Sequence, residues 1–286
     1  MPEAKRDAKE MEAKPSPALS DEDRQSVSEL SSGSAKVVHE VVRLQGDEEL
    51  DRPLQSLLFS GFAAGVAVSA SIMTQAFLRT HLPEAPWAEL IVLLGYTTGF
   101  VVVILGNLQL FTESTVTAVL PVATHPTLRN FGRLLRLWVA VLAANLAGTF
   151  LVALALSQQL FVDADKLAAA VAVSAPALSH DFVSTTLMAI PAGFLIASIA
   201  WILPNARGSE FWVITVITYI VALGGFVHIV AGSGEAWLLL LTGKTTLAGA
   251  VGGFLVPAFI GNVIGGSCLF AVLAHGQVRH EIKAER

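Results

Sequence analysis

The sequence predicts an all-α integral membrane protein with six transmembrane helices, arranged as two inverted repeats of three, in which the second and fifth helices are broken. Three observations support this. Hydrophobic residues make up 53% of the 286-residue chain, charged residues only 14%, and the mean hydropathy is +0.64. Six apolar runs are long enough to cross a hydrocarbon core of about 30 Å. Two of these runs are too long for one straight helix and carry glycines and polar residues near their middle.

Charge divides the chain into regions. Of 23 acidic residues, 13 precede Pro53 and only eight lie between residues 54 and 275. Residues 1–34 are rich in Glu, Lys, Ser and Pro and have little to bury, so they are predicted to form a disordered cytoplasmic leader. Residues 35–53 are predicted to be the region of an amphipathic cytoplasmic helix, 54–275 the membrane domain, and 276–286 a cytoplasmic tail.

The apolar face of the predicted cytoplasmic helix repeats at helical spacing. It consists of Val37, Val38, Val41, Val42 and Leu44, and the helix is expected to end near Gly46. Three alternatives remain open for this helix: packing against the cytoplasmic surface of the membrane domain, lying in the headgroup plane, or binding to a partner.

Several classes of function receive no support from the residues. No histidine pair has ligand spacing with a carboxylate or thiolate, so no metal is expected. No phosphate-binding loop, dinucleotide fingerprint or nucleophile elbow occurs, so neither a cofactor nor an enzymatic activity is expected. There is no basic field suited to nucleic acid. The N-terminus lacks the apolar core of a signal peptide, and the single cysteine, Cys268, excludes an internal disulfide.

The six apolar runs are 54–78, 87–120, 134–156, 182–203, 211–242 and 246–275. As straight helices, the second and fifth would be roughly 51 Å and 48 Å long, well beyond the bilayer core. Their interruptions lie at 106–114, with Pro121 closing the run, and at 224–235, where four glycines surround His228. A polar loop is expected over residues 157–181.

The two halves of the membrane domain align. Phe111 and Asn145 are 34 residues apart, as are His228 and Asn262, and both asparagines stand in Asn-x-x-Gly. Gly61-Phe62 is matched with Gly193-Phe194. Three spans per half force the second half to insert upside down, and broken helices at equivalent positions point to a central permeation site.

Basic residues indicate the orientation. Ten Lys and Arg residues near the spans lie on the side of the termini, and three, Arg79, Lys166 and Lys244, lie on the other. Positive residues concentrate on the cytoplasmic side. Both termini are therefore predicted to be cytoplasmic.

Between residues 87 and 275 and away from the loops, the ionisable residues are few: Glu113, His228 and Glu235. A charge facing lipid costs about 3 kcal/mol or more, so each should face protein or a wet cavity. His228 is expected to bond to, or exchange a proton with, a permeant anion, against the alternative of a neutral histidine satisfied by a backbone carbonyl. Glu113 either caps the second half-helix through its carboxylate, bonds to freed backbone groups, or lines the pathway. The same alternatives apply to Glu235, which is expected near the aqueous boundary. Asn145 and Asn262 are expected to hold the break loops.

Three motifs resemble the formate/nitrite transporter family: Leu110-Phe111-Thr112, Gly225-Phe226-x-His228 and the run 261–266, Gly-Asn-Val-Ile-Gly-Gly. The resemblance covers residues 54–275, and the segment 109–122 with the charged leader is similar to an inner-membrane branch of that family. It implies an aquaporin-like protomer, assembled as a homopentamer in the inner membrane, that passes formate, nitrite or a similar small anion, or its neutral acid, together with protons. The implied pathway residues are His228, Thr112, Phe111, Leu110, Tyr96, Phe100, Ile196, Val221 and Glu113, with Gly225 and Gly232 supporting the second break.

The sequence departs from the family pattern around the histidine. Val227 stands where the family has a glutamate, and Gly193 and Gly232 stand where asparagines are expected. Glu113 replaces a small polar residue beside Thr112. The polar shell of His228 is thus predicted to be thinner than in the family.

Three functions remain as hypotheses. The first is a proton-linked channel or transporter of small monovalent anions. The second is an aquaporin-like pore for a small neutral solute, although the paired Asn-Pro-Ala motifs of aquaporins are missing. The third is a non-conducting membrane scaffold acting through its leader and amphipathic helix.

Overall fold

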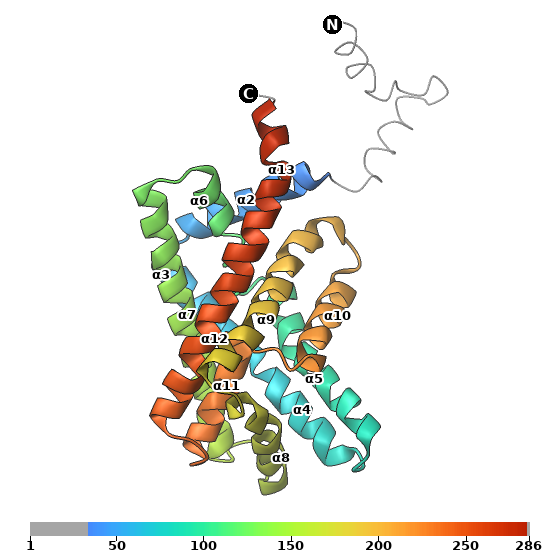
Figure 1. The fold of residues 1–286 in the computed structure, drawn as a ribbon. Coiled ribbons are helices and arrows are strands. Elements are labelled where there is room, and N and C mark those ends of the chain that lie inside the picture. Colours follow the sequence, from blue (N-terminus) through green and yellow to red (C-terminus); the bar gives the residue numbers. More distant parts are fainter. Residues whose placement is uncertain (1–33, 285–286) are drawn as a thin grey trace, which may run out of the picture. The chain divides into compact units, whose positions relative to one another are not determined.

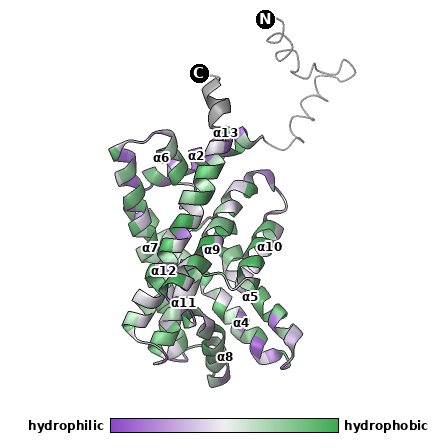
Figure 2. Cartoon of the chain, in the orientation of Figure 1, coloured by the Kyte–Doolittle hydropathy of each residue, from purple (hydrophilic) through white to green (hydrophobic). Residues whose placement is uncertain are grey.

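The computed structural model describes residues 34–284, and side chains as far as residue 278. The predicted disordered leader, apart from Ser34, lies outside the described residues. Within them every regular element is helical. Figure 2 shows that hydrophobic residues run along the helices, whereas hydrophilic residues gather towards the two ends of the helices.

Five helical segments are long and apolar enough to cross a membrane (Figure 1). They are α3 (Leu54–Val68) with α4 (Ala70–His81), α5 (Pro86–Leu105), α7 (Leu128–Ser157), α9 (Phe182–Ile202), and the last segment, in which α12 (Val256–Val263) and α13 (Val272–Ala284) alternate with π-helical stretches Gly249–Leu255 and Ile264–Ala271. The remaining crossing, the predicted fifth span, is divided between two short apolar helices, α10 (Glu210–Leu223) and α11 (Ile229–Leu241). The predicted architecture is confirmed.

The two breaks differ in length and in how the chain leaves them. After α5, residues 106–118 form turns and a short irregular stretch at 108–110 before the short helix α6 (Val119–Thr124), whereas only residues 224–228 separate α10 from α11. No half-helix therefore begins at Glu113 for its carboxylate to cap.

The backbone repeats itself at the two breaks with an offset of 118 residues. At the first, the N–H of Leu108 donates to the carbonyl of Val103, and Asn107 has φ of 49°. At the second, the N–H of Phe226 donates to the carbonyl of Val221, and Gly225 has φ of 61°. Both helices thus end in a residue of left-handed conformation, which asparagine and glycine adopt most readily.

The structure corrects the predicted register between the halves. Asn145 donates to the carbonyl of Gly61, and Asn262 donates to that of Ala189, so Gly61 corresponds to Ala189 rather than to Gly193. The prediction was wrong by four residues, one helical turn, because a Gly-Phe dipeptide recurs by chance in both helices. Gly193 corresponds instead to Gly65. A Cβ on Gly65 or Gly193 would lie within 2.4 Å of the main-chain carbonyl oxygen of Asn145 or Asn262, respectively. Both glycines therefore allow two helices to cross closely.

Helix α2 (Ala35–Asp51) packs across the membrane body, against α6, α7, α9 and α13 (Figure 1). It continues past Gly46, and its buried residues are His39 together with Val38, Val42, Gly46 and Leu50, which follow at a spacing of four. The predicted apolar face was therefore only partly right, since Val37 and Leu44 are exposed. A Cβ on Gly46 would lie 1.9 Å from the carbonyl oxygen of Thr117, so α2 presses directly on the first break.

Polar side chains at both ends of α2 bind it to the membrane body. Arg136 of α7 donates to the carbonyl of Leu50, and Arg133 forms an ion pair with Asp51. At the other end the rings of His39 and His275 are hydrogen bonded at 3.1 Å. The helix is thus joined to both halves of the body.

The predicted polar loop 157–181 contains a helix, α8 (Ala164–Ser174). The carboxylate of Asp163 caps it by accepting from the N–H of Lys166, and Ala169 and Ala170 are buried in a cluster with Ile72 and Leu238. The helix was not predicted because the residues at its ends are polar, although its alanine-rich centre has high helix propensity.

Candidate functional site

The two breaks meet inside the bundle. The Oγ1 atom of Thr112, in the first break, lies 2.7 Å from Nε2 of His228, in the second, and both side chains are buried. These residues are 116 positions apart in the chain. The structure therefore brings together the two residues that the sequence singles out in separate breaks.

Each break is held by one buried asparagine. Asn145 Oδ1 accepts from the N–H of Phe111, and its amide donates to the carbonyls of Gln109 and Gly61. Asn262 does the same for the second break, accepting from the N–H of Ile229 and donating to the carbonyls of Val227 and Ala189. Backbone groups freed by a helix break would be costly if left unpaired in a buried place. The asparagines satisfy them, so each break has its backbone hydrogen bonds completed by one side chain.

The hydrogen bonds of His228 fix its tautomer. Nδ1 accepts from the N–H of Ala231, so His228 is the N-cap of α11. A backbone N–H only donates, and Nδ1 therefore carries no hydrogen. In the neutral ring the hydrogen is on Nε2, which donates to Thr112. The alternative in which a carbonyl satisfies the histidine does not hold here, because the ring bonds to an amide and a hydroxyl.

Aromatic rings pack beside the Thr112–His228 pair. The ring of Phe100 lies edge-on to His228 with centroids 5.0 Å apart, and Tyr96 lies 5.1 Å from Phe100 on the same helix. Ile196 of α9 and Val221 of α10 are fully buried in the same hydrophobic cluster. Phe100 therefore lies directly against His228, and the other three predicted pathway residues belong to the same buried hydrophobic cluster.

Leu110 and Phe111 are also fully buried. The ring of Phe111 stacks on Phe259 of the last span at 5.6 Å and meets Trp138 of α7 edge-on. Trp138 in turn donates from Nε1 to the carbonyl of Ser114. Sequence reasoning did not identify Trp138, which supports the first break from outside.

The glycines near His228 have different roles. Gly225 needs its positive φ in the second break. A Cβ on Gly232 would lie 2.3 Å from a ring carbon of Phe254, which occupies the place of the asparagine expected there. At Gly193 a side chain would collide with the backbone of Asn262, so no polar group from this position reaches the histidine.

Glu113 faces α2. The N–H of Thr117 donates to the carbonyl of Glu113, which places the two side chains one turn apart on the same side, and the Thr117 hydroxyl donates to Glu49 Oε2 at 2.7 Å. Burial raises the pKa of Glu49 to about 7, against the lowering effects of this hydrogen bond and of Arg52. Glu49 was missed from the sequence because the helix was expected to end at Gly46. The spacing of four that joins Val38, Val42 and Gly46 continues to Leu50, and this pattern could have shown that the helix extends past Gly46.

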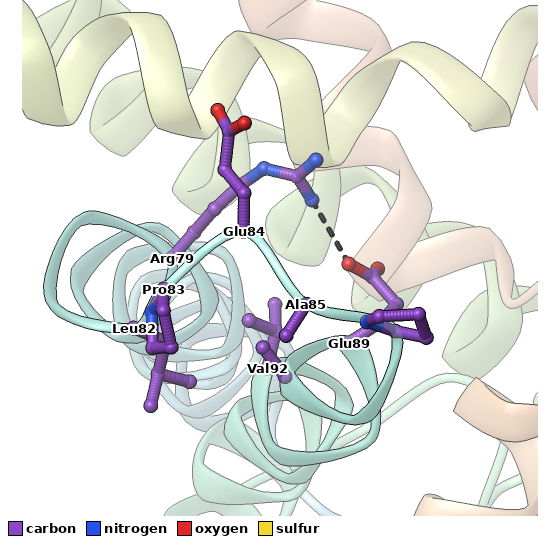
Figure 3. A pocket seen from close by; sticks show the side chains of 9 residues that line it. Arg79, Leu82, Pro83, Glu84, Ala85, Glu89 and Val92 are labelled. Carbon is purple, nitrogen blue, oxygen red and sulfur yellow. Dashed lines mark hydrogen bonds and ion pairs between the residues drawn. The ribbon is translucent and has the colours of Figure 1, made fainter.

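Two further features lie away from the pair. Glu235 is partly buried on α11, seven residues after His228. A surface pocket of about 400 Å³ lies where α4 turns into α5, and Figure 3 shows its ion pair between Arg79 and Glu89. None of the predicted pathway residues lines this pocket. Within residues 34–284, no cluster of three potential metal ligands occurs.

Comparison with known proteins gives matches along most of the chain. The family model described as formate/nitrite transporter matches residues 36–276. The inner membrane protein YfdC of Escherichia coli (strain K12) is 36% identical over 252 residues, which cover 88% of this chain and 81% of YfdC. The formate channel BtFdhC of Bacillus thuringiensis is 27% identical over 256 residues, covering 85% and 95%.

Solved structures share the fold. A pentameric formate channel with formate bound has a TM-score of 0.65 at 19% identity, covering 80% of this chain and 97% of the channel. An FNT family ion channel has a TM-score of 0.68 at 20% identity, covering 85% of this chain and 96% of that channel. The family match, the relative of 36% identity and the two matched breaks agree: the chain belongs to the formate/nitrite transporter family.

Proposed function

We propose that this protein is a channel or transporter for small monovalent anions such as formate, linked to protons, and that it works as a homopentamer in the inner membrane with both termini in the cytoplasm. The observation that carries the proposal is the direct hydrogen bond between Thr112 and His228 where two broken helices meet. The formate channels among its relatives support the anion class and the pentamer.

The residues around the pair indicate how such a site works. Burying a bare anion between Phe100, Ile196 and Val221 is costly, because these side chains offer no hydrogen bonds. The hydroxyl of Thr112 accepts from His228, so its own hydrogen is available to an arriving oxygen. An anion, or its neutral acid, thus exchanges its bound water for hydrogen bonds at the Thr112–His228 pair, between two apolar stretches of the pathway. No covalent reaction is required.

The test is flux into liposomes containing the purified protein, with formate, nitrite, lactate, hydrosulfide and glycerol, at pH 5.5 to 8.5. Formate is expected to enter faster than into protein-free liposomes, and faster at low pH. Replacement of His228 by Asn keeps a good N-cap for α11 but removes the ring. A lost hydrogen bond of about 1–3 kcal/mol at the constriction should lower the flux by about 5- to 150-fold.

Exposed His180 provides the matched control, since His180→Ala leaves the constriction unchanged. Unaltered anion flux and pH dependence in His228→Asn would contradict the proposed role of the ring. Passage of glycerol without any anion would favour a pore for a neutral solute, which the uncharged Thr112–His228 pair also accommodates. Passage of no solute, with loss of function on removal of residues 1–45, would favour a scaffold.

A further inference from the structure

His228 is poorly placed to lend a proton to a permeant anion. Its Nδ1 accepts from Ala231 N–H, and its Nε2 faces the Thr112 hydroxyl. A proton added at Nδ1 would set two donors against each other and break the cap of α11. If a small anion crosses as its neutral acid, one of the two forms that the proposed function allows, another group must exchange the proton.

Glu113 has the position for this role. It comes directly after Thr112 in the first break and is only partly accessible. Among residues 34–284 its carboxyl forms no hydrogen bond and no ion pair, in contrast to its backbone carbonyl, which accepts from Val116 and Thr117. A carboxyl group without a protein partner is free to bond to a solute.

Glu49 completes the arrangement from α2. Its carboxyl is joined by a hydrogen bond to Thr117, one turn beyond Glu113, and the two carboxyls act on each other electrostatically. Two carboxylates close together resist simultaneous ionisation, so such a pair tends to hold one proton between them.

Few other charges face this pair. Arg52, at the end of α2, is the basic group that acts on Glu49. On α7, Arg133 is engaged by Asp51, and Arg136 is engaged by the carbonyls of Leu50 and Arg52. From the last span, Ser267 contacts the first break by donating to the carbonyl of Thr115. From the second break, His228 contacts it through the hydroxyl of Thr112. No described basic side chain forms an ion pair with either carboxyl.

We propose that Glu113 and Glu49 form a proton-exchange pair that converts a small carboxylate anion into its neutral acid before it reaches the Thr112–His228 constriction. In the step, the O–H bond of the Glu113 carboxylic acid breaks and a new O–H bond forms on an oxygen of the anion. Glu113 is left as a carboxylate, and a proton from water returns to the pair through Glu49. On the reverse passage the same steps run backwards. This inference rests on the proposed function.

The test measures formate flux and internal pH together in liposomes at equal starting pH on both sides. Wild type is expected to carry one proton with each formate and to lose flux as pH rises from 6 to 8. Glu113→Gln keeps size and polarity but exchanges no proton, so formate flux should fall at least about tenfold and lose its pH dependence. Glu113→Asp retains a carboxyl and should keep the pH dependence at a lower rate.

Glu49→Gln is the second variant. It removes the negative neighbour, so Glu113 should ionise more easily and the flux should decline at a lower pH, by about one unit. Glu48→Gln, one residue away but exposed, is the matched control and should behave as wild type.

The outcomes separate this inference from the function on which it rests. A Glu113→Gln protein that keeps the wild-type pH profile, or a wild type that moves formate without protons, overturns the pair and leaves the channel intact. A wild type that carries no small anion overturns both. Should Glu113→Gln fail to fold, the unchanged pH midpoint of Glu49→Gln would equally refute the pair.

Discussion

At the scale of single residues, the site combines a symmetric pair of asparagines with an asymmetric central pair. Asn145 and Asn262 satisfy the same three backbone positions in their respective breaks, so the symmetric part of the site is the scaffold. The central pair is asymmetric, with a hydroxyl from one half and an imidazole from the other. Around it, Gly232 and Phe254 replace an expected polar side chain by an aromatic ring.

Gly232 and Phe254 should therefore behave as one packing unit. Gly232→Asn is expected to destabilise the protein by about 1–3 kcal/mol, because its Cβ would overlap the Phe254 ring. Combining it with Phe254→Leu should restore part of the loss, giving a favourable coupling energy of about 1 kcal/mol or more. The measurement is thermal unfolding in detergent. Gly132→Asn is the control, because nothing lies within 4 Å of a Cβ there. Strictly additive effects of the two changes would contradict the packing.

At the scale of elements, α2 is coupled to the first break. Gly46 allows the helix to touch the carbonyl of Thr117, and Glu49 accepts from the hydroxyl of the same residue. The carboxyl that makes this contact is buried by docking. Docking of α2 should therefore depend on pH.

Glu49 sets the sign of that dependence. Its pKa rises from 4.5 to about 7 when burial removes it from water, so docked α2 binds a proton more tightly than undocked α2. Docking should be strongest below pH 4.5, weaken as pH rises to 7, and change no further above it. The total change is at most about 3 kcal/mol. Hydrogen exchange of the α2 amides, corrected for intrinsic rates, should show less protection at pH 8 than at pH 5.

Two variants define the cause. Glu49→Gln should make the protection of α2 nearly independent of pH, whereas Glu48→Gln should leave the dependence unchanged. Equal protection of wild-type α2 at pH 5 and pH 8 would mean that Glu49 does not govern docking.

At the scale of the whole molecule, the described body is a duplication whose halves cross the membrane in opposite directions. The first half is α3–α4, α5 with α6, and α7; the second is α9, α10 with α11, and the segment 249–284. Six crossings place both ends of the body on one side of the membrane. The excess of Lys and Arg on that side predicts that it is cytoplasmic.

Cysteine labelling tests this orientation in intact cells. In a Cys268→Ser background, a membrane-impermeant maleimide should label Glu84→Cys, between α4 and α5, but not Gln45→Cys on α2. Both positions are exposed, so their reactivity should differ only through the membrane. Permeabilised cells should label at both positions. Labelling of Gln45→Cys in intact cells would reverse the assigned orientation.

Much of this fold was predictable because it depends on local signals. Run lengths and the glycines at 106 and 224–225 identified the two breaks, and the equal spacing to Asn145 and Asn262 identified the repeat. The residue-by-residue register was not predictable in the same way. A Gly-Phe dipeptide one turn away competed with the correct pair, and only the asparagine hydrogen bonds distinguish them. Helix α8 and the last turns of α2 were missed because polar residues interrupt their apolar patterns.

The sequence by itself determined that the chain enters the membrane, that two of its helices break, and that Thr112 and His228 lie in those breaks, since hydrophobic length and helix-breaking residues act locally. Only the tertiary structure decided that these two side chains bond to each other, that His228 is held with Nδ1 as an acceptor, and that Glu49 reaches the loop of Glu113. These contacts join residues far apart in the chain, and the packing of helices, which no local pattern encodes, brings them together.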